Sequence, residues 1–294
     1  MPCRPQVNFD ADPMPKPPRS PTASSVNRPV TSPRTRRPTT DTDRKVFDST
    51  LPPPDVCYGD AKSYLSLINR ASAQRSIPII ASLNGYNASS WMDFAGELQE
   101  AGADAIELNI YHPPVHEFSG PREIEDAIVE AVAEINASIT IPLFVKLERA
   151  YTSTPHLCRR LLSGSAGLVM YGRSPDRDIC LDTLSIQSKW ELTHAGSVVP
   201  MLASIMQIHS FCPAMPLAFS GGIGSASDVI KVLLAGADVA MVTSAIYREG
   251  PDAIRSLLDG LIVFMEQHQM QSIEDLQLRR PLQFASDQER TEYM

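Results

Sequence analysis

The sequence lacks the defining features of several protein classes. None of its apolar runs approaches the roughly 20 residues that a membrane-spanning helix needs. Its five cysteines, at positions 3, 57, 158, 180 and 212, include no C-x-x-C pair, so neither a disulfide framework nor a zinc site is indicated. The formal net charge of -8 argues against a nucleic-acid surface. We therefore expect a protein of the reducing cytoplasm, with no metal and with neither membrane nor nucleic acid as a partner.

Aromatic residues are also few, at 6%, but 43% hydrophobic residues is ordinary for a globular protein. The first 50 residues differ from the rest, because they hold ten of the 25 prolines and carry nine Lys and Arg against five Asp. Their charge is therefore +4, against -12 for the remainder. We predict a disordered arm over 1–50, since such a segment has little to bury, and consider a transit peptide less favoured. A folded domain over 51–280 and a tail over 281–294 follow.

From about residue 56, short apolar runs alternate with amphipathic stretches. The six runs predict strands at 77–83, 103–110, 142–147, 167–172, 216–222 and 238–245. The amphipathic stretches predict helices at 89–102, 121–136, 154–165, 199–210 and 225–237. Repeated βα units with nearly continuous apolar strands predict a parallel sheet, either doubly wound or closed as a barrel.

Two features favour the barrel. The tight turn "AGAD" precedes a strand at 101–104 and again at 235–238, and Gly-rich or Ser/Thr-rich stretches follow the last two strands. The predicted fold is a TIM (β/α)8-type barrel, incomplete because six βα units are recognisable where eight are expected. We expect either a wrong start or a truncated copy to account for the difference, and we expect two exposed strand edges.

Polar residues interrupt two of the predicted strands. In "ADAIELNI", Glu107 and Asn109 lie two positions apart and so share one face. In "PLFVKLE", the same period places Lys146 on the inward face, away from the aliphatic residues that meet the helices. An interior ammonium group needs an anion. That anion is either the Glu107 carboxylate, in a structural ion pair, or a ligand that gains negative charge, such as a reduced flavin.

The last two strands are followed by loops suited to phosphate. "FSGGIGSASDVI" (219–230) places Gly221 and Gly222 between a strand and a helix, and "VTSAIYREG" (242–250) adds Thr243 and Ser244 after the next strand. Backbone amides and hydroxyl groups from adjacent loops can surround a phosphate group. We interpret the pair of loops as a phosphate-binding cup, with turn geometry alone as the alternative.

The motifs "IPIIASLNG", "AGADAIELNIY", "IPLFVKL", "SGGIGSASDVIKVLLAGADVAMVTSAIYREGP" and "MQSIEDLQ" occur in the order and spacing of a known family. From about residue 51 to 277 the chain resembles the dihydroorotate dehydrogenase-like flavoproteins of the class 1 type. The resemblance implies a barrel with FMN at its C-terminal mouth and the FMN phosphate at Gly221, Gly222, Thr243 and Ser244. It also implies that Lys146 lies against the flavin, Asn109 near flavin and substrate, and Ser82 near the flavin.

The resemblance implies oxidation of dihydroorotate to orotate, a step of pyrimidine biosynthesis in which hydride passes to the flavin. The sequence departs from the family where the catalytic Cys is expected, because His112 stands there and Pro114 replaces an Asn. A histidine can serve as the base, although a solvated loop residue is the alternative. Gly172 replaces a further substrate-binding Asn, and 173–198 is long enough to form a hairpin lid over the mouth.

Two functions remain open. The first is an FMN-dependent oxidoreductase of the dihydroorotate dehydrogenase type, cytoplasmic and acting on a small-molecule substrate, with a homodimer left open. The second is a degenerate barrel that binds flavin or phosphate without catalysis, favoured by the missing amides and the missing βα units. A different phosphate-binding barrel, such as an aldolase or synthase, is a third alternative.

Overall fold

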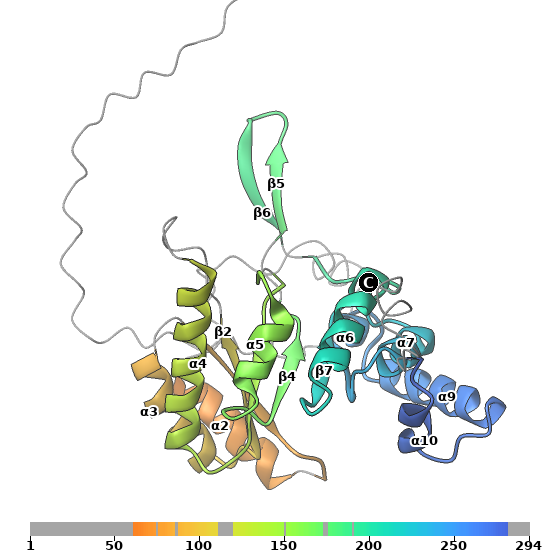
Figure 1. Ribbon diagram of the computed structural model, residues 1–294, viewed down its shortest axis with the longest axis horizontal. Coiled ribbons are helices and arrows are strands. Elements are labelled where there is room, and N and C mark those ends of the chain that lie inside the picture. Colours follow the sequence, from red (N-terminus) through yellow and green to blue (C-terminus); the bar gives the residue numbers. More distant parts are fainter. Residues whose placement is uncertain are drawn as a thin grey trace, which may run out of the picture.

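The computed structural model describes residues 61–74, 76–85, 88–110, 120–149, 151–172, 176–189 and 191–281. The predicted arm at 1–50 and nearly all of the predicted tail lie outside the described residues. The described part alternates strands and helices along most of its length, as the repeated βα pattern predicts (Figure 1).

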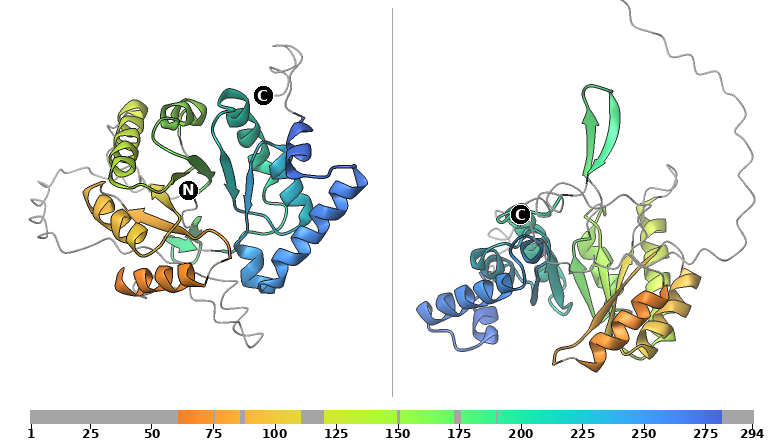
Figure 2. Two further views of the ribbon diagram at one scale, coloured as in Figure 1. Left: turned by 90° about the horizontal axis from the view of Figure 1, so that it is seen from below. Right: turned by 180° about the vertical axis from the view of Figure 1, so that it is seen from behind.

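A six-stranded parallel sheet forms the centre of the fold. Its strand order is β1-β2-β3-β4-β7-β8, so neighbours in space are neighbours along the chain except where a hairpin intervenes. The strands are β1 (Ile80–Gly85), β2 (Ala105–Ile110), β3 (Leu143–Leu147), β4 (Gly167–Met170), β7 (Leu217–Ser220) and β8 (Val239–Met241). All six predicted strands are confirmed, and the sheet curls into an incomplete barrel with helices around its outside (Figure 2).

Helices cover the outer face of this sheet. They are α2 (Ala61–Ala73), α3 (Ala88–Glu100), α4 (Pro121–Ser138), α5 (Thr154–Leu161), α6 (Val199–Phe211), α7 (Ala226–Leu234), α8 (Ser244–Glu249), α9 (Asp252–Gln267) and α10 (Ile273–Leu278). Helix α4 shows why the pattern predicts helices, because Ile128, Val132 and Ile135 recur at helical spacing and are all fully buried. None of the described helices is long and apolar enough to cross a bilayer.

The two faces of the strands differ in chemistry. In β3, Leu143, Val145 and Leu147 are completely buried against the helices, whereas Phe144 and Lys146 on the other face remain partly exposed. The register places Asn109 opposite both Asn84 and Lys146, so polar side chains of three strands form one row on the inner face. The period-2 alternation thus assigns the inner face correctly from the sequence.

The "AGAD" turns hold neighbouring strands in register. The Asp104 backbone N–H donates to the Ile79 carbonyl at 2.8 Å, while its carboxylate accepts the Ile79 N–H at 2.7 Å. Asp238 makes the equivalent pair of bonds to Leu217. In each motif the glycine two positions before the Asp, Gly102 or Gly236, has a positive φ, which explains why the motif contains a glycine. Each turn therefore fixes where the next strand starts.

The segment after β4 forms the predicted hairpin. Strands β5 (Asp176–Cys180) and β6 (Ser185–Lys189) pair antiparallel, with Ile179 opposite Ile186. The hairpin stands away from the barrel and does not lie across its mouth (Figures 1 and 2). The expected hairpin is present, but its position in this structure is not that of a closed lid.

A substitution of Asp104 tests whether its two hydrogen bonds to Ile79 hold the strands in register. We expect Asp104→Ala to lower the free energy of unfolding by about 1–2 kcal/mol, because the Ile79 N–H loses a charged acceptor. Asp104→Asn, which keeps an acceptor oxygen, should cost less. Urea unfolding measures the change, with Asp259→Ala on the exposed face of α9 as the control expected to stay within about 0.5 kcal/mol. Equal values for Asp104→Ala and the control would contradict this role of Asp104.

Candidate functional site

The described polar residues singled out by the sequence lie along the inner face of β1, β2 and β3 or in the loops that follow β7 and β8. They form two groups on either side of β4: one on β1, β2 and β3, and one in the loops that follow β7 and β8. Because parallel strands end at the same edge of a sheet, both groups belong to one rim of the incomplete barrel. This is the edge at which open α/β sheets and barrels bind ligands.

The first group is an ion pair with a third partner. Lys146 Nζ lies 3.1 Å from Glu107 Oε1, and the Ser82 hydroxyl donates to the same oxygen at 3.0 Å. Only 18% of the Lys146 side chain and 7% of that of Glu107 are exposed. The ion pair expected from the alternation is therefore present, and Ser82 belongs to it. Lys146 retains two further N–H donors for which the described residues provide no hydrogen-bond acceptor.

Tyr64 of α2 fixes the strand that carries Ser82. Its hydroxyl donates to the Ser82 carbonyl at 3.0 Å and accepts from the Ser82 N–H at 2.9 Å. Burial raises the pKa of Tyr64, and the negative charge of Glu107 adds to that effect. The phenol therefore stays protonated and keeps both bonds, which anchors β1 at its outer edge, where no strand pairs with it among the described residues.

Asn109 does not stand alone. Its side-chain amide donates to the side-chain oxygen Oδ1 of Asn84 on the neighbouring strand β1. Gly172, just beyond β4, lies close by: a Cβ built at that position would be 3.2 Å from Asn109 Oδ1. The sequence offered a signal for Asn84 that was missed, because it lies two positions after Ser82 and so on the same face.

The second group contains the proposed cup and one residue that sequence reasoning missed. The Gly222 N–H donates to Thr193 Oγ1 at 3.0 Å, and Thr193 Oγ1 donates in turn to Ser244 Oγ at 2.9 Å. The structure thus joins Gly222 and Ser244 through a third loop. Thr243 is exposed, and Gly221 has a positive φ of 115°. No spacing in the sequence connects Thr193 with these loops.

The loop that carries Thr193 is held from two sides. Arg248 of α8 donates to the carbonyl groups of Leu192 and Thr193, the former at 2.7 Å. Asp228, with 2% exposure, accepts from the N–H groups of Gly196, Gly224 and Ser225. Asp228 also completes a capping box with Ser225 at the start of α7. One buried carboxylate therefore ties the Thr193 loop to the Gly-rich loop.

His112 and Pro114 lie outside the described residues, so the structure describes neither the proposed base nor its neighbour. The described residues contain no group of three His, Cys, Asp or Glu side chains arranged to hold a metal ion.

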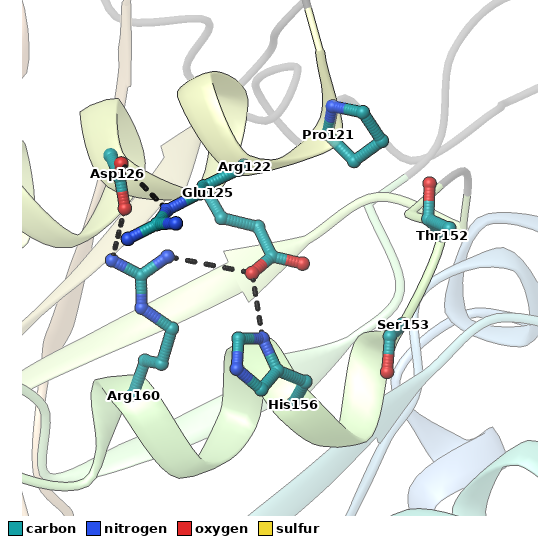
Figure 3. Close-up of a pocket in the computed structure, with 8 residues that line it drawn as sticks. All are labelled: Pro121, Arg122, Glu125, Asp126, Thr152, Ser153, His156 and Arg160. Atoms are coloured by element: carbon teal, nitrogen blue, oxygen red, sulfur yellow. Dashed lines mark hydrogen bonds and ion pairs between the residues drawn. The ribbon is translucent and has the colours of Figure 1, made fainter.

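A pocket lined by charged residues lies elsewhere, between the first turns of α4 and α5 (Figure 3). Its charges are paired with one another: the buried Glu125 accepts from His156 at 2.8 Å and from Arg160, which also binds Asp126. The Asp126 carboxylate raises the pKa of Arg160. These contacts join two outer helices, and we assign them a structural role.

A protein-family model described as dihydroorotate dehydrogenase matches residues 59–265, which is most of the chain and includes both groups of the rim. The chain belongs to the dihydroorotate dehydrogenase family. The match places the rim residues within the sequence that defines the family, in agreement with the motifs from which the resemblance was inferred.

Individual relatives are distant. The catalytic subunit of dihydroorotate dehydrogenase B (NAD(+)) of Thermoplasma volcanium is 25% identical over 208 residues, which cover 68% of this chain and 67% of that protein. Dihydroorotate dehydrogenase A (fumarate) of Limosilactobacillus reuteri is 26% identical over 213 residues, with 68% and 67% coverage. The enzyme of the same name from Lactobacillus helveticus is 28% identical over 210 residues, with 68% and 66% coverage. The chain thus spans about two thirds of each relative.

A double-mutant cycle tests the interior ion pair. We expect Lys146→Met and Glu107→Leu each to destabilise the protein, because each leaves a charge largely buried without its partner. The double variant should lose less stability than the sum, with a coupling of about 1–3 kcal/mol. Chemical unfolding measures all four proteins. The exposed pair Arg122 and Asp126, 4.0 Å apart, is the control and should couple by less than about 0.5 kcal/mol. Additive losses at Lys146 and Glu107 would exclude a significant ion pair.

Proposed function

We propose that this chain is an FMN-dependent oxidoreductase of the dihydroorotate dehydrogenase type, which oxidises dihydroorotate to orotate in pyrimidine biosynthesis. The observation that carries the proposal is the presence, on one rim, of an interior ammonium group with free N–H donors and a cup of loop amides and hydroxyl groups. Membership of the family supports the same reaction.

The described residues fit FMN at its phosphate end. A Cβ at Gly221 would have no heavy atom of the described residues within 4 Å, so among these residues there is space for a ligand. At Gly222 a Cβ would lie 2.8 Å from Ser197, so only glycine lets the Thr193 loop approach its backbone. Gly221, Gly222, Thr243 and Ser244 would hold the phosphate group through amides and hydroxyl groups.

The other end of the rim fits the flavin ring. Lys146 would donate to the ring with N–H groups that Glu107 does not use, and Glu107 would keep the ammonium group oriented. Asn109 and Ser82 would lie beside it, as the family resemblance implies. The flavin, when bound, supplies the redox chemistry by accepting a hydride from a substrate carbon.

The remaining chemistry falls to the chain itself. We propose that His112 removes the substrate proton as a general base, since an imidazole is partly neutral at physiological pH. Asn109 would orient the substrate through its amide.

The scattered cysteines, of which Cys158, Cys180 and Cys212 are free thiols, support the cytoplasmic location expected from the sequence.

A second function, flavin or phosphate binding without turnover, is favoured by one specific observation. Gly172 has no side-chain amide to offer the substrate, and a Cβ added there would lie 3.2 Å from Asn109 Oδ1, so one of the two would have to shift by a few tenths of an ångström. A site that lacks a hydrogen-bonding group loses affinity for the substrate that needs it. Both functions share the same flavin site and differ in whether dihydroorotate reduces it.

Anaerobic spectroscopy separates the two functions. We expect purified protein supplied with FMN to show a bound-flavin spectrum that bleaches when dihydroorotate is added and returns with fumarate or NAD+ as oxidant. Lys146→Ala should bind FMN less tightly and abolish bleaching, because the ring loses its cationic partner.

The control is Arg122→Ala, an exposed residue of the outer helix α4, which should bleach as the unmodified protein does. A flavin spectrum that does not bleach with dihydroorotate would favour binding without this reaction. Protein that binds no FMN would contradict both the oxidoreductase and the flavin-binding function.

A further inference from the structure

Thr193 connects two loops of the cup through three hydrogen bonds, and two of these fill both acceptor positions of the Ser244 hydroxyl. Its backbone N–H donates to Ser244 Oγ at 3.0 Å, and its hydroxyl donates to the same atom at 2.9 Å. The Thr193 hydroxyl accepts from the Gly222 N–H at 3.0 Å. Two neighbouring loops of the cup are thus connected through one threonine side chain.

The hydrogen-bonding capacity of a hydroxyl group gives this arrangement a direction. A serine hydroxyl has two acceptor lone pairs and one proton. Because Thr193 supplies donors to both lone pairs, Ser244 Oγ can only donate, and no acceptor for its proton is found among the described residues. Ser244 is therefore prepared to bind an acceptor atom, such as a phosphate oxygen, and not a donor.

The chain of bonds also strengthens that donor. Successive hydrogen bonds from the Gly222 amide through Thr193 to Ser244 polarise one another, as aligned hydrogen bonds do in a protein interior. Arg248 and Asp228 hold the Thr193 loop in place through its carbonyl and N–H groups. Because these bonds within the chain fix the Thr193 loop, little ordering opposes the binding of a phosphate.

We propose that Thr193 is a positioning residue of the phosphate cup, which commits the Ser244 hydroxyl to donate to a phosphate oxygen. This inference rests on the proposed function, because it assigns the phosphate of FMN to that cup. Thr193 carries no charge, yet through Ser244 it would make the cup select an anionic acceptor group such as phosphate. Thr193 acts through Ser244.

Comparison of FMN with riboflavin, which lacks the phosphate group, tests the inference. Flavin fluorescence quenching gives Kd for both ligands. We expect Thr193→Val, which keeps the shape but loses the hydroxyl, to weaken FMN binding about tenfold, the loss of roughly one hydrogen bond to a charged group. Riboflavin binding should stay within about twofold. Thr193→Ser, which restores the hydroxyl, should return FMN affinity to within about threefold of the unmodified protein.

Ser244→Ala supplies the second arm. If Thr193 acts through Ser244, Ser244→Ala should weaken FMN binding by a similar factor, and the double variant with Thr193→Val should be no weaker than Ser244→Ala alone. If the fold losses in FMN affinity of the two single variants multiply in the double variant, the inference is overturned. If Thr193→Val loses riboflavin binding as well, its fold is damaged, and Thr193→Ala takes its place. Thr193→Ala should then weaken FMN binding while riboflavin binding is retained.

Other outcomes separate this inference from the proposed function. Tighter FMN binding by Thr193→Val would show that the threonine competes with phosphate, and would overturn the inference while flavin binding stands. Equal affinity of the unmodified protein for FMN and riboflavin would do the same. Binding of neither flavin would overturn the proposed function, and the inference with it.

Discussion

The structure depends on one constraint: its parallel strands are covered by helices on one face only. Leu83, Leu108 and Val145 are 2% exposed or less on the outer face. That burial supplies the hydrophobic stabilisation of the domain and leaves the inner face free to carry polar groups. On the inner face, Lys146 and Glu107 lie beside buried apolar residues such as Val169 and Ala105. Each polar group there then needs a partner, and the partners define the site.

The two groups of the rim satisfy this need in different ways. Near β1 to β3, charge is compensated by charge, since Glu107 receives both the ammonium group of Lys146 and the hydroxyl of Ser82. Near β7 and β8 no charged side chain faces Ser244 among its described hydrogen-bond partners, and hydroxyl and amide groups bind one another. The first arrangement suits a ring that accumulates negative charge, and the second suits a phosphate that is charged throughout. Under the proposed function, the two groups would recognise the two anionic parts of FMN in different ways.

The sequence predicts the parts of this fold that depend on periodicity. Six strands, the inner position of Lys146 and the "AGAD" turns follow from spacing alone, because alternation and tight turns are local properties. Asn84 was within reach of the same rule. Thr193 was not, since its contacts with Gly222 and Ser244 span 29 and 51 residues and depend on how three loops meet. The hairpin was predictable from its length, but its direction depends on loop geometry that no pattern encodes.

Gly172 and Asn109 show why a departure from a family pattern cannot be read one residue at a time. Asn109 donates to Asn84, and its own carbonyl oxygen lies 3.2 Å from the place that a Cβ at Gly172 would occupy. A side chain at position 172 would have to displace Asn109 by a few tenths of an ångström, or be displaced by it. The missing amide at Gly172 and the pairing of Asn109 with Asn84 are therefore one structural feature. Under the proposed function, a change of substrate preference would therefore involve all three positions together, whereas the proposed phosphate cup is built from other residues.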